Sequence, residues 1–232
     1  MSEGLSAEPM YEAFADAFDV HAGSGAYNAL YDRPALLALA GDVAGLDVLD
    51  AGCGPGFYAA ELVSRGARVT ACDASPRMVE LAAARAVGAH EVRVTDLERP
   101  LPWADGSFDL VLMALVLHHV VDRVGMLREV RRVLRPSGRL VLSTVHPTAD
   151  WRWGGGGYFD VDDVEEEWND GWQVRFRRQP LSAWSDEFVA AGFLIERVVE
   201  PLPVPEMAES DPEVFERLSR EPGFIAFSLV PR

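Results

Sequence analysis

The stretch Val48-Leu49-Asp50-Ala51-Gly52-Cys53-Gly54-Pro55-Gly56 decides the fold that the rest of the chain must fit. An apolar run ends at an acidic residue, and a Gly-x-Gly-x-Gly turn follows directly. Glycines are needed where the backbone turns sharply and a ligand approaches it closely. The carboxylate of Asp50 would repel a phosphate at this turn, whereas a ligand with an ammonium group and no phosphate suits it. The stretch therefore predicts a strand over 46–50, a ligand-binding turn, and a helix over 57–65.

Two further acidic residues end the next two predicted strands. Asp73 follows a strand over 68–72, and Asp96 follows a strand over 91–94. An acid 19 residues after Gly54 is placed to accept hydrogen bonds from both hydroxyls of an adenosine ribose. Asp96 is placed to accept from an adenine amino group. Each acid alone could be a helix N-cap or a turn residue, but three acids around one glycine loop favour a nucleoside site.

Outward from this segment, short apolar strands alternate with helices. Continuous apolar strands separated by helices imply a parallel sheet that is covered on both faces. The pattern predicts a helical cap over 1–45, an α/β core over 46–147, a lid over 148–180, and a return to the same α/β domain over 181–232. Helices are expected at 76–86, 122–134, 182–191 and 212–220, with Ser75 as an N-cap, and strands at 108–113, 139–145, 193–200 and 223–229.

Composition excludes several classes of protein. The chain has 232 residues, 49% of them hydrophobic, so it can build a core and is not disordered throughout. Its net charge of -16 would repel DNA or RNA, so we expect no nucleic-acid partner. All 21 basic residues are arginine, which excludes lysine-dependent mechanisms. Two cysteines, no apolar run of membrane-spanning length and no basic leader predict a cytoplasmic protein without a membrane partner.

The sequence resembles the class I S-adenosylmethionine (SAM) dependent methyltransferases, in the broad group that includes the ubiquinone and menaquinone C-methyltransferases. The resemblance covers about residues 46–146. Its motifs are DAGCGPG at 50–56, DASPRM at 73–78, DL at 96–97, LPWADGSFD at 101–109, LHH at 117–119 and LRPSG at 134–138.

The resemblance implies a Rossmann-like fold and SAM as cofactor. The expected sheet is mostly parallel, with seven strands in the order 3-2-1-4-5-7-6, strand seven antiparallel, and helices on both faces. Gly52 and Gly54 would face the methionine part, with Asp50 near its ammonium, and Asp73 would hold the ribose. The other cofactor contacts expected on this basis are Cys53, Ala74, Met78, Asp96, Leu97, Ala114 and Leu115.

Methyl transfer from a sulfonium is an in-line displacement, so the enzyme mainly aligns the reacting atoms in a dry pocket. A base helps only if the acceptor is a hydroxyl, a protonated amine or an acidic carbon. Three histidines come just after predicted strands and are therefore candidates for this base. His119 is the first candidate, followed by His118 and then His146. Each could instead hold local structure. No histidine, cysteine or acid cluster has metal-ligand spacing, so we expect no metal.

Aromatic residues in the cap and the lid are candidates for contact with the acceptor. Tyr27 could contact the cofactor and Tyr31 the substrate, or both could pack the cap on the sheet. Aromatic walls suit a flat or cationic acceptor. The acidic run 160–167 could attract a positive substrate, although the solvent face of a two-stranded hairpin explains it more simply. The aromatic candidates in the lid are Trp151, Trp153, Tyr158 and Trp168, with Phe159 and Trp172 beside them.

The function expected from this sequence is methyl transfer from SAM to an oxygen or nitrogen of a small metabolite in specialised metabolism, with an aromatic acceptor as one option. A quinone-type C-methyltransferase and a non-catalytic SAM-binding protein are the alternatives. A nicotinamide-dependent oxidoreductase is disfavoured, because the glycines lack the Gly-x-Gly-x-x-Gly spacing. We expect a monomer or a homodimer.

Overall fold

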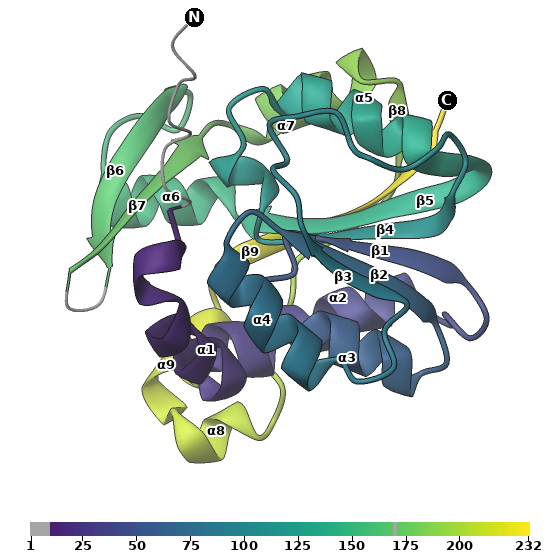
Figure 1. Cartoon of the computed structure of the whole chain (residues 1–232). Helices are drawn as coiled ribbons and strands as arrows, with labels where there is room; N and C mark the ends of the chain where they lie inside the picture. The colour runs from purple at the N-terminus through teal and green to yellow at the C-terminus, as the bar shows by residue number, and fades with distance from the viewer. Residues whose placement is uncertain (1–9, 169–170) are drawn as a thin grey trace, which may run out of the picture.

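The computed structural model describes residues 10–168 and 171–232, and within these ranges one seven-stranded sheet forms the centre of the molecule (Figure 1). Its order is β3-β2-β1-β4-β5-β9-β8, and β9 is antiparallel to both of its neighbours. Numbered within this sheet alone, the order is 3-2-1-4-5-7-6, so the expected topology is confirmed. The strands are β1 Asp47–Ala51, β2 Arg68–Asp73, β3 Glu91–Val94, β4 Phe108–Ala114, β5 Leu134–Val145, β8 Phe193–Val199 and β9 Phe224–Pro231.

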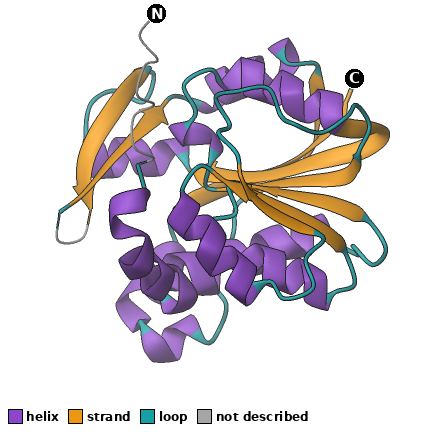
Figure 2. Ribbon diagram, viewed as in Figure 1, coloured by secondary structure: helices purple, strands orange, loops and turns teal. Residues whose placement is uncertain are grey.

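Helices cover both faces of this sheet (Figures 1 and 2). On one face α5 (Arg123–Val133) and α7 (Leu181–Ala190) pack their apolar sides against the central strands. On the other face lie α2 (Arg33–Ala40), α3 (Phe57–Ser64) and α4 (Pro76–Arg85). β1 and β4 are buried between the two layers, which explains their near-continuous apolar sequence.

Local sequence signals fix where the central helices begin. The Ser75 hydroxyl accepts a hydrogen bond from the Met78 N–H at 3.0 Å, and Pro76 occupies the first turn of α4. Asp122 caps α5 in the same way, by accepting from the Gly125 N–H at 2.9 Å. The predicted N-cap at Ser75 is therefore confirmed.

The predicted lid region contains a helix and a separate hairpin. The helix α6 (Pro147–Gly154) follows β5, and β6 (Asp162–Trp168) then pairs antiparallel with β7 (Trp172–Arg178). Figure 2 shows this two-stranded sheet standing apart from the main one. The acidic run lies on the predicted two-stranded hairpin, where Glu165 and Glu167 are exposed and Glu166 lines the cavity described below.

Three details differ from the sequence prediction. β5 begins at Leu134, directly after α5, rather than at 139, because Leu134 is buried and pairs with Phe108. A short helix, α8 (Met207–Ser210), precedes α9 (Pro212–Leu218). The cap contains more than two helices: a 3-10 turn at Glu12–Phe14 (η1), α1 at Ala15–Ser24, and a π-helical turn at Asn28–Asp32 (η2) that runs into α2. Residues 1–9 of the predicted cap lie outside the described residues.

The cap, α6 and the hairpin gather at the carboxyl edge of the parallel strands, at the left of Figure 1. Open α/β sheets bind their ligands at this edge. Within residues 10–168 and 171–232, no helix is long and apolar enough to cross a membrane.

Candidate functional site

The three glycines of the loop after β1, Gly52, Gly54 and Gly56, all have positive φ, and the last two have different roles. Gly56 has φ +86°, and a Cβ there would lie 2.6 Å from the Cα of Ala82 in α4, so a glycine is required for the helices to pack. Gly54 has φ +51°, but the nearest atom to its Cβ position is on the Phe18 ring at 4.0 Å. Gly56 therefore serves packing, whereas Gly54 leaves space above the loop.

Asp73 anchors this loop to the end of β2. One carboxylate oxygen accepts from the Gly54 N–H at 2.9 Å, and the other accepts from the Ser75 N–H at 2.9 Å. Each oxygen can accept a second hydrogen bond. Burial raises the pKa of Asp73. The carboxylate thus holds the loop in place and keeps acceptor capacity for two more donors.

Two carboxylates are buried around β1, behind the glycine loop. Asp50 is 1% exposed, and its Oδ2 has no hydrogen-bond partner among the described residues. Burial, reinforced by the charge of Asp73, raises the pKa of Asp50 to about 7. Asp32 is also buried and accepts from the Tyr58 hydroxyl at 2.5 Å, and burial raises its pKa to about 6. Asp32 was not predicted from the sequence, because it lies outside every motif.

A cavity of about 710 Å³ opens at this edge of the sheet, between the glycine loop, the cap and the hairpin. Such a volume is typical of small-molecule sites. Asp50 is not among the residues that line it and lies behind the loop, so its nearness to a cofactor ammonium stays a prediction. The predicted cofactor contacts that do line it are Gly52, Cys53, Gly54, Asp73, Ala74, Met78, Asp96, Leu97, Ala114, Leu115 and Tyr27.

Leu115 marks the floor of the cavity with a strained backbone. It is the non-glycine residue with positive φ (56°) in the part of the chain that the structure describes. Its N–H donates to both the carbonyl and the hydroxyl of Ser143, at 3.1 and 3.2 Å, which holds it in this conformation. Strain of this kind concentrates at functional sites.

The two adjacent histidines differ in what their ring nitrogens do. His119 Nδ1 lies 2.7 Å from the Arg175 carbonyl, which can only accept, so this nitrogen carries the proton. Burial lowers the pKa of His119 to about 4, so the ring is neutral, and its Nε2 accepts from the Tyr11 hydroxyl at 3.1 Å. Both nitrogens of His119 are therefore occupied by structural contacts.

His118 keeps one nitrogen available. Its Nδ1 lies 3.1 Å from the Thr144 hydroxyl, while Nε2 has no hydrogen bond among the described residues. The ring lines the cavity and is 3% exposed, and burial lowers its pKa well below the usual range. Of the two histidines, His118 is the one free to exchange a proton with a ligand.

The third candidate base, His146, lies away from the cavity wall. It is the N-cap of α6, where its Nδ1 accepts from the Thr148 N–H at 3.1 Å. Its Nε2 lies 3.1 Å from a carboxylate oxygen of Glu200. His146 therefore caps α6 and contacts Glu200, a structural role that its place in the sequence after β5 did not indicate.

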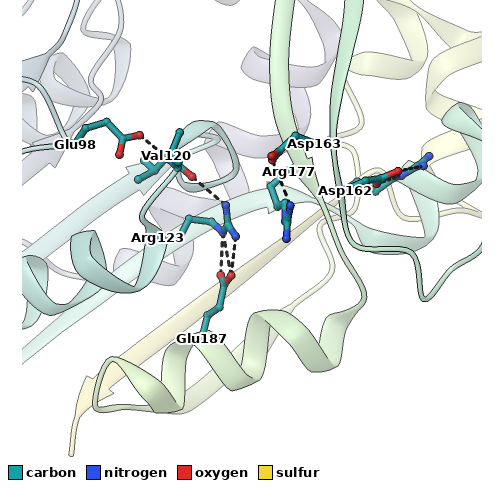
Figure 3. Close-up of polar contacts among 9 residues, drawn as sticks. Glu98, Val120, Arg123, Asp162, Asp163, Arg177 and Glu187 are labelled. Atoms are coloured by element: carbon teal, nitrogen blue, oxygen red, sulfur yellow. Dashed lines mark hydrogen bonds and ion pairs between the residues drawn. The ribbon is translucent and has the colours of Figure 1, made fainter.

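The loop that carries the histidines, η3 (Leu117–His119), is held by charged side chains just beyond it (Figure 3). Arg123 donates to the Val120 carbonyl at 3.0 Å and to both carboxylate oxygens of Glu187 at about 3 Å. Glu98 accepts from the N–H groups of Val121 and Asp122, at 2.6 and 3.3 Å. These contacts fix η3 between the sheet, α5 and α7.

The cap is attached to the cofactor side of the cavity by polar contacts. Glu12 accepts hydrogen bonds from the Ser75 hydroxyl and from the Arg77 N–H. Asp16 pairs with Arg77 at 2.8 Å, and Asp19 pairs with Arg85 at 2.7 Å. On the other side, the ring of Phe14 stacks on Trp172 of the hairpin at 4.9 Å. The cap therefore bridges α4 and β7 across the cavity.

The hairpin and α6 form the remaining wall. Trp153 and Trp168 line the cavity as predicted, together with Trp172, Phe176, Asp150, Glu166 and Arg178. Trp151 and Tyr158 do not line it: Trp151 is 46% exposed, and the Tyr158 hydroxyl accepts from the Leu181 N–H. Tyr31 is fully buried among Met207, Leu218 and Phe224, and its hydroxyl accepts from the Gly223 N–H. The structure therefore does not support substrate contact by Trp151, Tyr158 or Tyr31. For Tyr31, the packing explanation accounts for its burial.

Metal ions in proteins are usually bound by groups of histidine, cysteine and acidic side chains. Among residues 10–168 and 171–232, no three histidine, cysteine or acidic side chains form a group that could hold a metal ion. Cys53 and Cys72 are free and buried.

Part of the chain is similar to known methyltransferases. Residues 49–142 match the family model of a methyltransferase domain. The chain is 37% identical over 110 residues to a ubiquinone biosynthesis O-methyltransferase of Xanthomonas oryzae, covering 46% of each chain. It is 37% identical over 138 residues to a malonyl-[acyl-carrier protein] O-methyltransferase of Serratia marcescens, covering 58% of this chain and 53% of the relative. The chain thus matches about half the length of these curated relatives.

Solved structures extend the likeness to nearly the whole chain. A SAM-dependent methyltransferase from Mesorhizobium loti is 26% identical with a TM-score of 0.69, covering 91% of this chain and all of that one. A protein from Listeria monocytogenes described as a SAM-dependent methyltransferase has a TM-score of 0.74 at 23% identity, over 87% of this chain and 96% of its own.

Proposed function

We propose, from the premise that this chain carries a class I methyltransferase domain, that it transfers a methyl group from SAM to a small-molecule acceptor. The observation that carries the proposal is the glycine loop, which Asp73 fastens at the mouth of a cavity lined by the residues expected to bind the cofactor. The homologous domain and the cavity thus point to the same chemistry.

The residues around the loop fit this cofactor. Asp73 keeps acceptor capacity for two ribose hydroxyls, and Ala74 and Met78 provide apolar borders for a base. Gly54 has no side chain to fill the space above the loop. Asp50 lies behind it with an unpartnered oxygen, and its negative charge would attract an ammonium across the loop. The donor and acceptor set therefore suits an amino-acid-linked nucleoside without phosphates.

When bound, the cofactor supplies a methyl group on a sulfonium, with a neutral thioether as leaving group. This chain contributes alignment and a dry enclosure, since the cap and the hairpin cover the cavity. We assign the proton-accepting role to Nε2 of His118, in the tautomer whose Nδ1–H donates to the Thr144 hydroxyl. Burial lowers the pKa of His118 and keeps the ring neutral, so its Nε2 is an unprotonated hydrogen-bond acceptor.

The charge and the enclosure favour a metabolite over a macromolecule. A net charge of -16 repels nucleic acid, and a cavity of about 710 Å³ admits a small acceptor. Two free, buried cysteines are compatible with a reducing compartment, and we place the reaction in the cytoplasm.

Two measurements test this function. Titration calorimetry with S-adenosylhomocysteine (SAH), the demethylated cofactor, should give binding that NADH does not compete for. Incubation with methyl-labelled SAM and a cell lysate should then place label in the small-molecule fraction. Label in protein or RNA would contradict a metabolite acceptor. Binding without label in any fraction would favour a non-catalytic SAM-binding protein.

A further inference from the structure

We propose that the half of the cavity opposite the glycine loop binds a cationic nitrogen group of the acceptor, an ammonium or a guanidinium, between Asp150 of α6 and Glu166 of β6. The inference rests on the proposed function, because it concerns the acceptor of that same reaction. It goes beyond it by naming the charge that the acceptor must carry.

Asp150 is the first observation. Its side chain lines the cavity while only 7% of the residue is exposed, and its carboxylate has no hydrogen bond or ion pair among the described residues. Burial raises its pKa to about 7, and the nearby charges of Glu166 and Asp162 oppose the lowering effect of Arg178. An unpartnered buried carboxylate is costly unless a donor reaches it. A cationic ligand would supply that donor.

Glu166 provides a second acceptor beside it. One carboxylate oxygen accepts from the Trp168 indole N–H at 3.2 Å, and the other has no hydrogen bond within the described chain. That second oxygen, Oε1, lies 3.7 Å from the position that a Cβ would occupy on Gly154, another residue of the cavity wall. Glycine at this position therefore leaves the carboxylate accessible from α6.

The cation near this pair is already engaged. Arg178 pairs with Asp162 through two contacts of 2.9 and 3.1 Å and also donates to the Gly155 carbonyl at 2.9 Å. On the far side of the cavity, Arg33 donates to the Ala22 carbonyl and lies 4.5 Å from the centre of the Phe57 ring. With Asp150, Glu166 and Asp162 against Arg178, this wall carries a net negative charge. A carboxylate or phosphate acceptor would be repelled there.

Aromatic rings complete the subsite. Trp153, Trp168, Trp172 and Phe176 line the same cavity, and the Trp168 indole contacts Glu166 directly. Aromatic faces attract cations, and their surfaces exclude water, which strengthens the pull of the two carboxylates. The chemistry that fits is an amine or guanidine on a flat or apolar body.

The test uses matched ligand pairs that differ only in charge. Protein saturated with SAH at pH 7.5 is titrated with tryptamine and with tryptophol, then with phenethylamine and with 2-phenylethanol. We expect the amine of at least one pair to bind tenfold or more tightly than its alcohol. Asp150→Asn should abolish that preference. Glu165→Gln, on the exposed face of β6, should keep it.

The outcomes separate the two proposals. Equal binding of amine and alcohol in both pairs, absence of binding in both, or a preference that survives in Asp150→Asn overturns the cationic subsite. Unchanged SAH affinity in the same samples leaves the proposed function standing. If the wild-type protein does not bind SAH, the proposed function itself is overturned.

Discussion

The Tyr11 hydroxyl donates a hydrogen bond to Nε2 of His119, 3.1 Å away and 108 residues along the chain. Because the other ring nitrogen donates to the Arg175 carbonyl, His119 joins three segments: the cap, the loop after β4, and the hairpin. The ring that the sequence favoured as a base therefore connects the parts that enclose the cavity. In its neighbour His118, Nε2 has no hydrogen bond among the described residues.

Replacing Tyr11 by Phe tests this connection. The substitution removes one buried hydrogen bond and leaves Nε2 of His119 unpaired, so we expect a loss of about 1 kcal/mol in the free energy of unfolding. Urea denaturation measures it, and hydrogen exchange of residues 10–24 should become faster at the same time. Unchanged exchange would show that the cap is held by its other contacts alone.

Gly54 and Gly56 should respond differently to alanine. Both have positive φ, which costs about 1–2 kcal/mol for any L side chain. Gly56→Ala also forces a Cβ to within 2.6 Å of the Ala82 backbone, so it should unfold more readily than Gly54→Ala. Gly54→Ala should remain folded but lose affinity for SAH, because its methyl group enters open space above the loop. Thermal unfolding and calorimetry of the two variants check both statements, and equal stability of the two would contradict the packing argument.

Asp50→Asn should stabilise the unliganded protein in a pH-dependent way. The pKa of Asp50 is raised to about 7 by burial, above its value of about 3.9 in an unfolded chain. A raised pKa stabilises the fold below the unfolded value, and that contribution is lost as the pH rises through 7. The variant should therefore match the wild type near pH 4 and exceed it at pH 8 by at least about 1.4 kcal/mol.

Urea unfolding between pH 4 and 8 provides the measurement for Asp50→Asn. Asp186→Asn, an exposed substitution on α7, is the control and should leave the pH profile unchanged. If Asp50 attracts the cofactor ammonium, Asp50→Asn should also weaken SAH binding while it stabilises the free protein. A variant that is less stable at pH 8 would refute the burial explanation.

Arg123→Met and Arg177→Met separate a buried ion pair from a weaker one (Figure 3). The side chains of Arg123 and Glu187 are 10% and 17% exposed, so removal of the arginine leaves a largely buried carboxylate without its partner. For Arg123→Met we expect the free energy of unfolding to fall by about 3 kcal/mol or more. Arg177 lies 3.5 Å from Asp163, which is 56% exposed, and its removal should cost about 1 kcal/mol or less. Chemical denaturation measures the free energy of unfolding of both variants. Similar losses in the two would contradict the conclusion that Arg123 and Glu187 form the stronger ion pair.

The cofactor half of the site was predictable because it is encoded locally. Asp73 is the last residue of β2 and Asp96 follows β3 by two residues, and parallel strands end at a common edge, so linear position was enough to bring them to the cavity. Asp50 also ends its strand, but it is buried and does not line the cavity, and strand position alone does not determine this burial.

The acceptor half was not predictable to the same degree. Position after a strand could not separate His118 from His119 or His146, because their roles depend on partners such as Tyr11, Arg175 and Glu200. The aromatic richness of the lid was visible, but only its packing decided that Trp153 and Trp168 face the cavity while Trp151 and Tyr158 do not. Asp150 carried no motif at all.

The sequence by itself determined the alternation of strands and helices and the glycine loop, because apolar segments and tight turns are properties of neighbouring residues. The strand order and the cofactor class were predicted from the family resemblance that the motifs of residues 46–146 carry. Only the tertiary structure decided which side chains enclose the acceptor. Those side chains come from the cap, η3, α6 and the hairpin, and their burial and pairing depend on contacts between segments more than 100 residues apart, such as Tyr11 with His119. Local pattern cannot encode such contacts. The acidic run 160–167 was visible in the sequence, but only the folded chain brings Asp150 and Glu166 to the same cavity.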